Sequence, residues 1–272
     1  MTSVGPGTGD PETVSIGGLP VAHFTAPELV DWLDRRLQQG QGSWVVTANV
    51  DFVSRARAQP EIASLYRQAD VIIADGMPLV WASRLRGQPL PERIAGSSLL
   101  FDLAERAADR GHRLYLLGGT DGNELRTAEM LQQRYPGLEI AGSHAPWVAA
   151  VPTDDEITEI ATRIEAAGPV QMLFIAFGSP KQERLAERLR ARFPETLLIG
   201  VGASFSLATG DLRRAPEWMQ RSGLEWLHRM VQEPGRLIRR YLVDNLPVVI
   251  GMCLAALVAR WFGASDRSGS ER

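Results

Sequence analysis

The regular alternation of short apolar runs with helical segments is the feature that most constrains the fold of this chain. From residue 113 onward, each apolar run is rich in β-branched or aromatic residues and precedes a segment with the spacing of an amphipathic helix. The predicted strands are 113–117, 138–142, 170–177 and 196–201, and the predicted helices are 124–135, 154–167 and 181–193. Strands that alternate with helices form a mostly parallel sheet covered on both faces. The sequence therefore predicts a Rossmann-like α/β fold.

The first part of the chain extends this pattern. Strands are predicted at 44–46 and 70–74, with a short strand pair within 14–21. Helices are predicted at 27–39, 52–66, 78–85 and 98–109, with Ser97 or Ser98 as the cap of the last one. With 272 residues, of which 44% are hydrophobic, the chain can build one substantial core. We place this α/β catalytic core at residues 13–211.

The two ends of the chain do not continue the pattern. Residues 1–12 are rich in Gly, Pro, Ser and Thr and have neither the basic nor the apolar region of a signal peptide, so we expect a disordered leader. Residues 263–272 are expected to form a disordered tail. Cys253 is the single cysteine, which excludes an intrachain disulfide and suits the cytoplasm. The net charge of −3 disfavours general nucleic-acid binding.

Residues 212–262 form an appendage that is basic first and apolar afterwards. Its basic part holds seven arginines against three glutamates, with aromatic residues among them. Its apolar part, residues 246–262, is interrupted only by Arg260 and is shorter than the roughly eighteen residues of a membrane-spanning helix. This composition predicts helices that dock on an anionic membrane surface. The alternative is a helix pair packed against the core or against a second subunit of a homo-oligomer.

The loop after the strand at 170–177 is suited to an anion. Gly178 and Pro180 break the apolar run, and Lys181 opens the next helix. In a parallel sheet this loop lies at the edge where ligands bind, and the helix behind it points free backbone N–H groups toward that edge. Lys181 is also the only lysine among 29 Lys and Arg residues. We therefore predict that Gly178 and Lys181 belong to an anion site; a solvated surface lysine is the alternative.

Polar or small residues follow the other predicted strands as well. Thr47 and Asn49 follow the strand at 44–46, Asp75 follows the strand at 70–74, and a glycine-rich loop at 118–122 follows the strand at 113–117. Because the carboxyl ends of parallel strands meet at one edge, these residues are predicted to line one pocket. For the loop at 118–122 a plain strand-to-helix turn is an equal alternative. An Asp before Gly is commonly a turn residue. The alternative for Asp75 is a general base whose pKa is raised by partial desolvation.

The sequence offers no metal site and no nucleotide-binding fingerprint. Its four histidines lack ligand spacing, and no Asp-x-Asp pair occurs. The patterns G-x-G-x-x-G and G-x-x-x-x-G-K-[ST] are both missing. We therefore expect no metal and no cofactor, so that protein side chains would neutralise an anionic leaving group.

Short motifs between residues 14 and 241 resemble one known family. They are TAN at 47–49, ADG at 74–76, ERIAG at 92–96, GSPKQE at 178–183, EWLHR at 225–229, EP at 233–234 and RRY at 239–241. Together they are similar to the motifs of the WecG/TagA/CpsF glycosyltransferases, glycosyltransferase family 26. One departure concerns the Asn-Pro that is usual after the first strand, which reads Asn49-Val50 here. The asparagine is kept, and the conformation of its loop is left open.

The resemblance implies an activity and a set of site residues. It implies the inverting, metal-independent transfer of a sugar from a UDP-sugar to an undecaprenyl-diphosphate-linked saccharide, on a fold called GT-E. It also implies that Asp75 is the base and that Thr47, Asn49, Arg93 and Gln182 lie in the pocket; we group Arg93 with Asp75 as catalytic. The donor sugar stays open among N-acetylmannosamine, N-acetylmannosaminuronic acid, glucose and glucuronic acid.

Such a transfer needs a base for the acceptor hydroxyl and positive charge for the departing diphosphate. The sequence offers Lys181, Arg229, Arg236 and Arg239 for the charge, although arginines of the appendage can equally form a solvated helix face. The expected location is the cytoplasm, peripheral on the inner face of the cell membrane, where the lipid-linked acceptor lies. The rival functions are a noncatalytic nucleotide-sugar-binding or membrane-docking module and another Rossmann-type nucleotide-dependent enzyme.

Overall fold

A computed structural model describes residues 9–120 and 122–268 of the chain. Residues 1–8 of the predicted leader and residues 269–272 of the predicted tail lie outside this part. Residues 9–12 contact the core, since the Trp32 indole donates to the carbonyl of Gly9 and the backbone N–H of His23 donates to that of Glu12. The helix α13 (Leu246–Ser268) extends into residues 263–268 of the predicted tail.

The core is built on a six-stranded sheet with the strand order β4-β3-β8-β7-β5-β6. Every neighbouring pair in this sheet is parallel, which confirms the predicted α/β class. The strands are β3 (Ser43–Ala48), β4 (Val71–Ala74), β5 (Arg113–Gly118), β6 (Glu139–His144), β7 (Met172–Ala176) and β8 (Leu197–Gly200). All residues of β3, β4, β7 and β8 are buried, which explains why these strands read as continuous apolar runs and not as alternating ones.

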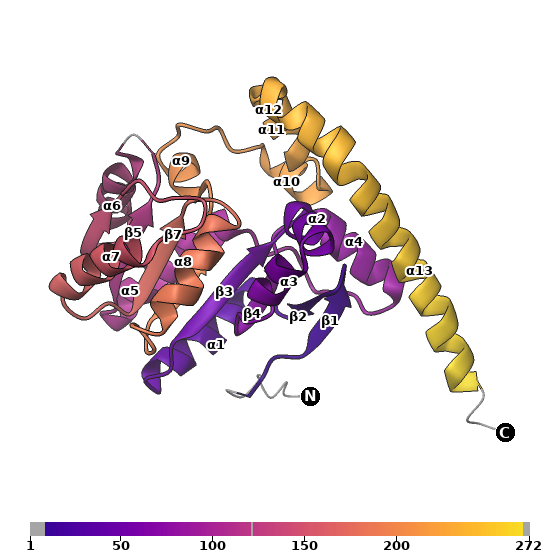
Figure 1. Ribbon diagram of the computed structural model, residues 1–272, viewed down its shortest axis with the longest axis horizontal. Coiled ribbons are helices and arrows are strands. Elements are labelled where there is room, and N and C mark those ends of the chain that lie inside the picture. The colour runs from indigo at the N-terminus through magenta and orange to yellow at the C-terminus, as the bar shows by residue number, and fades with distance from the viewer. Residues whose placement is uncertain (1–8, 121, 269–272) are drawn as a thin grey trace.

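Helices cover both faces of this sheet (Figure 1). Side chains that alternate along a strand point to opposite faces, so Trp44 and Val46 of β3 belong to one hydrophobic cluster and Val45 to the other. One cluster includes residues of α2 (Val50–Ala58), α3 (Pro60–Tyr66), α4 (Met77–Arg86), α7 (Asp154–Ala166) and α8 (Lys181–Arg190). The other includes residues of α1 (Ala26–Gln38), α5 (Gly96–Arg110), α6 (Asn123–Arg134) and α9 (Ser204–Ala208).

One local prediction is confirmed by the structure and two are wrong. The predicted strand pair is present as the hairpin of β1 (Thr13–Ile16) and β2 (Leu19–Ala22). The single helix expected at 52–66 is two helices, because Pro60 starts α3 and lacks the N–H that would continue α2. The expected cap of α5 is wrong: Ala95 is its N-cap, no side chain caps it, and Ser98 instead accepts a hydrogen bond from Arg214.

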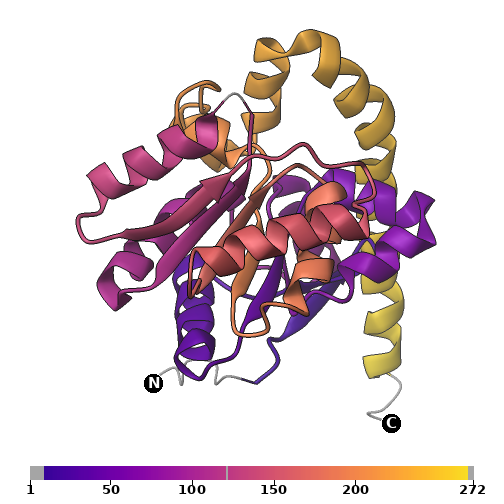
Figure 2. The ribbon, with the colours of Figure 1, turned by 60° about the vertical axis from the view of Figure 1, so that its left-hand side comes forward.

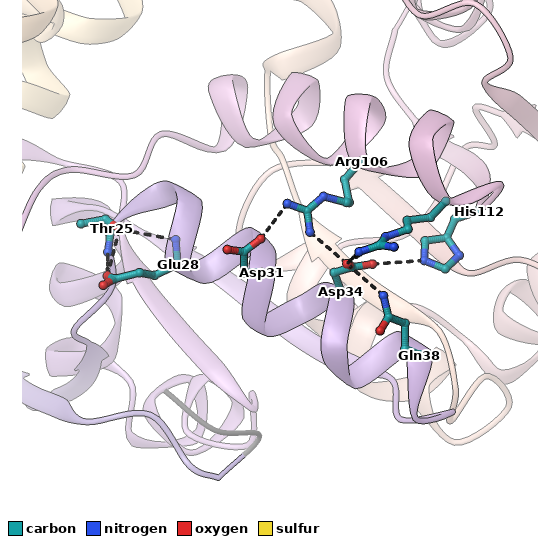
Figure 3. A network of polar contacts seen from close by, with 8 residues as sticks. Thr25, Glu28, Asp31, Asp34, Gln38, Arg106 and His112 are labelled. Atoms are coloured by element: carbon teal, nitrogen blue, oxygen red, sulfur yellow. Dashed lines mark hydrogen bonds and ion pairs between the residues drawn. The ribbon is translucent and has the colours of Figure 1, made fainter. Parts of the chain in front are cut away.

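A polar cluster ties α1 to the end of α5 (Figure 3). The buried carboxylate of Asp34 pairs with Arg106 at 2.9 Å and Arg110 at 3.0 Å, and it accepts a hydrogen bond from Gln38. His112 lies 3.6 Å from the same carboxylate. Because His112 directly precedes β5, this cluster lies at the amino ends of the strands. It is a structural link on the side of the sheet opposite the ligand-binding edge.

The chain ends in a helical appendage. It comprises α10 (Glu217–Ser222), α11 (Glu225–Gln232), α12 (Pro234–Ile238), the π-helix η1 (Arg239–Asn245) and α13. Figures 1 and 2 show α13 as a long helix on one flank of the core, where it packs against α4 and α2. Met252 and Ala256 are buried in this contact, whereas large apolar side chains on the outer face are exposed.

The apolar helix is longer than the sequence led us to expect. The segment 239–261 is continuous helix of 23 residues, and by length and composition alone it could cross a membrane. The expectation that the segment is too short to span is therefore wrong. The difference arises because helical structure begins upstream of Leu246, in η1, and includes the apolar residues Leu242 and Val243.

Candidate active site

A pocket of about 680 Å³ opens at the carboxyl edge of the sheet. It is lined by residues that follow β3, β4, β7 and β8 and by residues of the appendage. Residues 118–120 and 122, the described part of the loop that the sequence placed in the same pocket, are not part of its lining. The strand order explains this: β8 lies between β3 and β7, whereas β5 lies beyond β7. The loop after β8, residues 201–204, lines the pocket in its place.

Asp75 stands at the end of β4 in the wall of this pocket. Its backbone N–H donates to Ala48 at 2.8 Å, and its carboxylate accepts from the N–H of Gly96 at 3.2 Å. A Cβ at position 96 would lie 3.3 Å from the Thr47 methyl group, which is slightly tight, and 3.5 Å from the Asp75 carboxylate, which is an ordinary contact. The side chain of Asp75 thus bonds to the start of α5 and not to its own turn, which favours the general base over the turn residue.

The surroundings of Asp75 make it a weak acid. Desolvation raises its pKa to about 7, against the lowering effect of Arg93 and of the hydrogen bond from Gly96. Glu225 raises the pKa further, and Arg229 lowers it. A carboxyl group with a pKa near neutrality can accept a proton from a substrate hydroxyl and release it again.

Arg93 joins the core to the appendage beside this carboxylate. Its guanidinium lies 2.6 Å from the Glu225 carboxylate of α11, and both side chains are largely buried, with 15% and 16% exposed. Arg93 and Glu225 both line the pocket, together with Arg229. Asp75, Glu225, Arg93 and Arg229 therefore bring charges of both signs together in one pocket.

Thr47 and Asn49 line the pocket as predicted, and each also shapes it. The Thr47 hydroxyl donates to the carbonyl of Gly200 at 2.9 Å, which links the ends of β3 and β8. The Asn49 side chain accepts from the N–H of Asp51 and caps α2. Val50 is the first residue of α2, a position that accepts proline and many other residues. The replacement of the usual proline by Val50 therefore leaves the cap intact.

Gln182 lines the pocket mainly as a brace between two loops. Its side-chain oxygen accepts from the N–H groups of Gly178 and Gly202, each at 3.1 Å, and its nitrogen donates to Glu183 at 2.7 Å. A Cβ at position 200 would come within 2.4 Å of the Gln182 amide, so glycine is needed there. Because its amide is used within the protein, Gln182 positions the loops after β7 and β8.

Lys181 does not reach the pocket. Its ammonium group donates to the carbonyl of Val148 at 2.6 Å and lies 5.8 Å from the ring of Phe177. Lys181 thus holds the loop between β6 and α7, while Gly178 alone of the predicted pair lines the pocket. The structure does not support the predicted use of this ammonium as a counter-charge.

The appendage brings some of its arginines to the pocket and not others. Arg229 lines it, as does Arg240, which forms an ion pair with Asp51. Arg239 is exposed and lies outside the lining. The side chain of Arg236 lies outside the part of the chain that the structure describes. Of the predicted arginines with described side chains, Arg229 lines the pocket and Arg239 does not.

Comparison with known proteins shows what kind of protein has this pocket. The sequence model of the WecG/TagA/CpsF glycosyl transferase family matches residues 14–261, nearly the whole described chain. The chain belongs to this family. The resemblance drawn from the short motifs is confirmed, and the protein is a glycosyltransferase of polysaccharide biosynthesis.

Two similar members of the family are both named N-acetylglucosaminyldiphosphoundecaprenol N-acetyl-beta-D-mannosaminyltransferase. The protein from Bacillus spizizenii W23 is 34% identical over 200 residues, which cover 74% of this chain and 75% of that protein. The protein from Bacillus subtilis 168 is 29% identical over 240 residues, covering 88% of this chain and 91% of that protein.

Several pocket residues of this family member were not assigned to the site from its sequence. They include Arg55, Trp81, Ser204, Glu225 and Arg240. Helical spacing places Arg55 one turn after Asp51 on the same face of α2, which is a usable signal. For Arg240 the signal was its place among the seven arginines of the basic part of the appendage. Nothing in the sequence shows that Trp81 on α4 faces a pocket, because that depends on where α10–α13 pack.

A second buried carboxyl group supports the loop after β7. Burial raises the pKa of Glu183 to about 7, and the hydrogen bond from Gln182 acts in the opposite direction. In the same loop the Ser179 side chain bonds to the Tyr66 hydroxyl at 2.8 Å, and the Ser179 carbonyl accepts from Arg55 at 2.5 Å. These contacts fix the backbone that forms one wall of the pocket.

Proposed function

We propose that the protein transfers an N-acetylmannosamine-type sugar, with inversion, from a UDP-sugar to a saccharide linked to a polyprenyl diphosphate. The observation that carries this proposal is the Asp75 carboxyl, with a pKa of about 7, beside Arg93 and Arg229 in one pocket. The names of the two relatives supply the sugar class and the acceptor class. Family membership supports the type of reaction.

The proposed reaction is a single displacement. The acceptor hydroxyl oxygen attacks the anomeric carbon of the donor sugar while the bond from that carbon to the diphosphate oxygen breaks. The hydroxyl proton passes to the carboxylate of Asp75, and UDP leaves with the electron pair of the broken bond. With a pKa of about 7, about half of the Asp75 carboxyl groups are ionised and ready to accept a proton at neutral pH.

Arginines are the proposed counter-charge for the departing diphosphate. Guanidinium groups bind phosphate oxygens through paired N–H donors, and in a water-restricted pocket their charge acts strongly. The support for this role is that Arg93, Arg229 and Arg240 line the pocket. Arg236 and Arg239 stay predictions for the same diphosphate. Among residues 9–120 and 122–268, no group of three or more His, Cys, Asp or Glu residues is placed to hold a metal ion.

We also propose that the protein works at the inner face of the cell membrane, with α13 in contact with lipid. The support is the row of exposed apolar side chains on the outer face of α13, the length of this helix and the lipid-linked acceptor named for the relatives. The rival of a second subunit covering α13 predicts a dimer in solution. A noncatalytic binding or docking module would not need a proton acceptor, so it does not account for the raised pKa of Asp75.

A turnover assay tests the proposed function. The full-length protein is incubated with UDP-N-acetylmannosamine and a short-chain lipid-diphosphate N-acetylglucosamine acceptor, with release of UDP and the anomeric configuration of the product as readouts. We expect transfer with inversion that persists in EDTA. A product of retained configuration would contradict the single displacement, and activity that requires Mg²⁺ or Mn²⁺ would contradict the arginine counter-charge. UDP-glucose and UDP-glucuronic acid in place of the donor test the assigned sugar class.

A further inference from the structure

The lining of the pocket combines charged and apolar side chains. Asp75, Arg93 and Arg229 are among the charged ones. The aromatic and aliphatic ones include a set that we call the apolar wall: Phe52, Trp81, Trp226, Tyr241, Leu242 and Leu246. The proton transfer and the charge neutralisation described above use only the charged side chains.

The apolar wall is built from three parts of the fold. Phe52 comes from α2, Trp81 from α4, and the remaining residues from α11, η1 and α13. Trp226 and Tyr241 pack edge to face, with ring centroids 6.0 Å apart and planes at 80°. Asp51 holds η1 in place, through its ion pair with Arg240 and the hydrogen bond that it accepts from Asn245 at 2.8 Å. Polar contacts of residues that line the same pocket therefore position the η1 part of the wall.

The apolar surface continues from the pocket onto the outside of α13. Leu242 and Leu246 line the pocket and are also 47% and 46% exposed. Residues three or four positions apart lie on the same face of a helix. This face continues from Leu246 to further exposed side chains at these spacings: Ile250, Leu254, Leu257, Val258 and Trp261. At 1.5 Å per residue this apolar stripe is about 28 Å long.

We propose that the apolar wall of the pocket binds the first isoprene units of the acceptor lipid, while the arginines of the lining bind the acceptor diphosphate. This assignment rests on the proposed function and names the lipid part of its acceptor. A ligand with an anionic group and an apolar chain matches a lining that offers both kinds of side chain, and Leu242 and Leu246 connect this lining to the exposed stripe. The rest of the isoprenoid chain would lie along the stripe on α13, between the pocket and the bilayer.

The alternative is that the whole isoprenoid chain of the acceptor stays in the bilayer and the protein contacts only the diphosphate and the saccharide. The two arrangements differ in how acceptor binding depends on chain length when no membrane is present. If the pocket binds the chain, each added isoprene unit buries apolar surface until the wall is covered. If the bilayer alone holds the chain, its length has no effect in a vesicle-free solution.

The test uses full-length protein without vesicles or detergent and one saccharide diphosphate carrying a methyl group or one, two or three isoprene units. We expect the KM for the acceptor to fall about tenfold or more between the methyl acceptor and the longest one. In the Leu242→Gln, Leu246→Gln double variant we expect the KM for the longest acceptor to rise about tenfold and the dependence on chain length to disappear. Leucine and glutamine have similar helix propensities, so the substitutions suit η1 and α13.

Two variants serve as matched controls. Leu125→Gln replaces a leucine on α6 that is 56% exposed and outside the pocket lining, and it should keep the full dependence on chain length. Leu254→Gln lies on the apolar stripe but outside the pocket and should keep it as well. Loss of the dependence in Leu254→Gln, or its absence in the wild type, would place the chain outside the pocket and overturn the proposal.

A binding measurement separates this proposal from the proposed function. Geranyl diphosphate and methyl diphosphate are titrated into the protein by calorimetry, with no sugar donor present. Tighter binding of geranyl diphosphate, lost in the Leu242→Gln, Leu246→Gln variant, supports the lipid site even if no sugar transfer is found. Sugar transfer with equal affinities for the two diphosphates would support the proposed function and reject the lipid site.

Discussion

At the scale of single residues, the chemistry of Asp75 comes from its place at the tip of β4. There it loses water, gains one backbone hydrogen bond and lies near charges of both signs, and desolvation dominates. Replacing it with asparagine keeps the shape but removes the proton acceptor. We expect Asp75→Asn to bind UDP with the affinity of the wild type and to lower single-turnover rates by about 10² to 10⁴. Rates close to those of the wild type would exclude Asp75 as the base.

The raised pKa also predicts the pH dependence of the reaction. The base works in its ionised form, so kcat/KM should rise about tenfold per pH unit below pH 7 and level off above it. Glu183 has a similarly raised pKa but lies behind the loop, and Glu183→Gln should keep the same profile. A profile that is flat between pH 5 and 8, or one that Glu183→Gln shifts, would show that another group limits the rate.

The same two carboxyl groups should affect stability in the opposite sense from ordinary surface acids. Both have folded pKa values of about 7, whereas an unfolded chain releases these protons near pH 4. Between about pH 4 and 7 the folded state holds more protons, so the free energy of unfolding falls as the pH rises through this range. We expect Asp75→Asn and Glu183→Gln each to raise the melting temperature at pH 8 more than at pH 4.5. Equal shifts at both pH values would contradict the raised pKa values.

At the scale of elements, the loops after β7 and β8 form one unit because Gln182 bonds to both. Loss of this amide in Gln182→Ala leaves the N–H groups of Gly178 and Gly202 without their acceptor. We expect weaker UDP-sugar binding by about tenfold, measured by calorimetry. Lys181→Met provides the comparison, since its ammonium points to Val148, and should change this affinity by less than about threefold. A larger loss in Lys181→Met would mean that the lysine turns into the pocket when a ligand binds.

Strand positions and the polar residues at their ends were predictable from the sequence, because buried parallel strands read as apolar runs with clear stops. Thr47, Asn49 and Asp75 were found in this way, and the structure brings them together. Strand order was not predictable, and it decides that the loop after β8 replaces the loop after β5. The direction of the Lys181 side chain was also not predictable from the sequence, because it depends on a hydrogen bond to the carbonyl of Val148, which lies in a loop distant in sequence.

At the scale of the whole molecule, the appendage and the core share one site. Glu225 of the appendage pairs with Arg93 of the core, and Arg240 pairs with Asp51 at the start of α2. These pairs join the helices that carry Arg229 to the strand ends that carry Asp75. A division of the chain at residue 212 therefore separates two parts that complete one pocket, and the activity should require both.

The outer face of α13 gives the last prediction, which concerns the membrane. Ile250, Leu254 and Val258 are between 52% and 58% exposed and lie one helical turn apart, so their replacement leaves the contact with α4 intact. The triple change to glutamine removes apolar surface that would enter the lipid interface. We expect the wild type to sediment with vesicles that contain anionic lipids and the triple variant to stay largely in solution.

Two further measurements distinguish the loss of membrane contact from unfolding and from the loss of a subunit contact. The triple variant should keep its helical content by circular dichroism and its rate with a short-chain acceptor in solution, yet lose rate with a long-chain acceptor in vesicles. Sedimentation velocity tests the rival contact, because a second subunit covering α13 would make the wild type a dimer and the variant a monomer. If the wild type is such a dimer and ignores vesicles at low salt, the exposed face of α13 serves subunit contact and the proposed membrane docking is wrong.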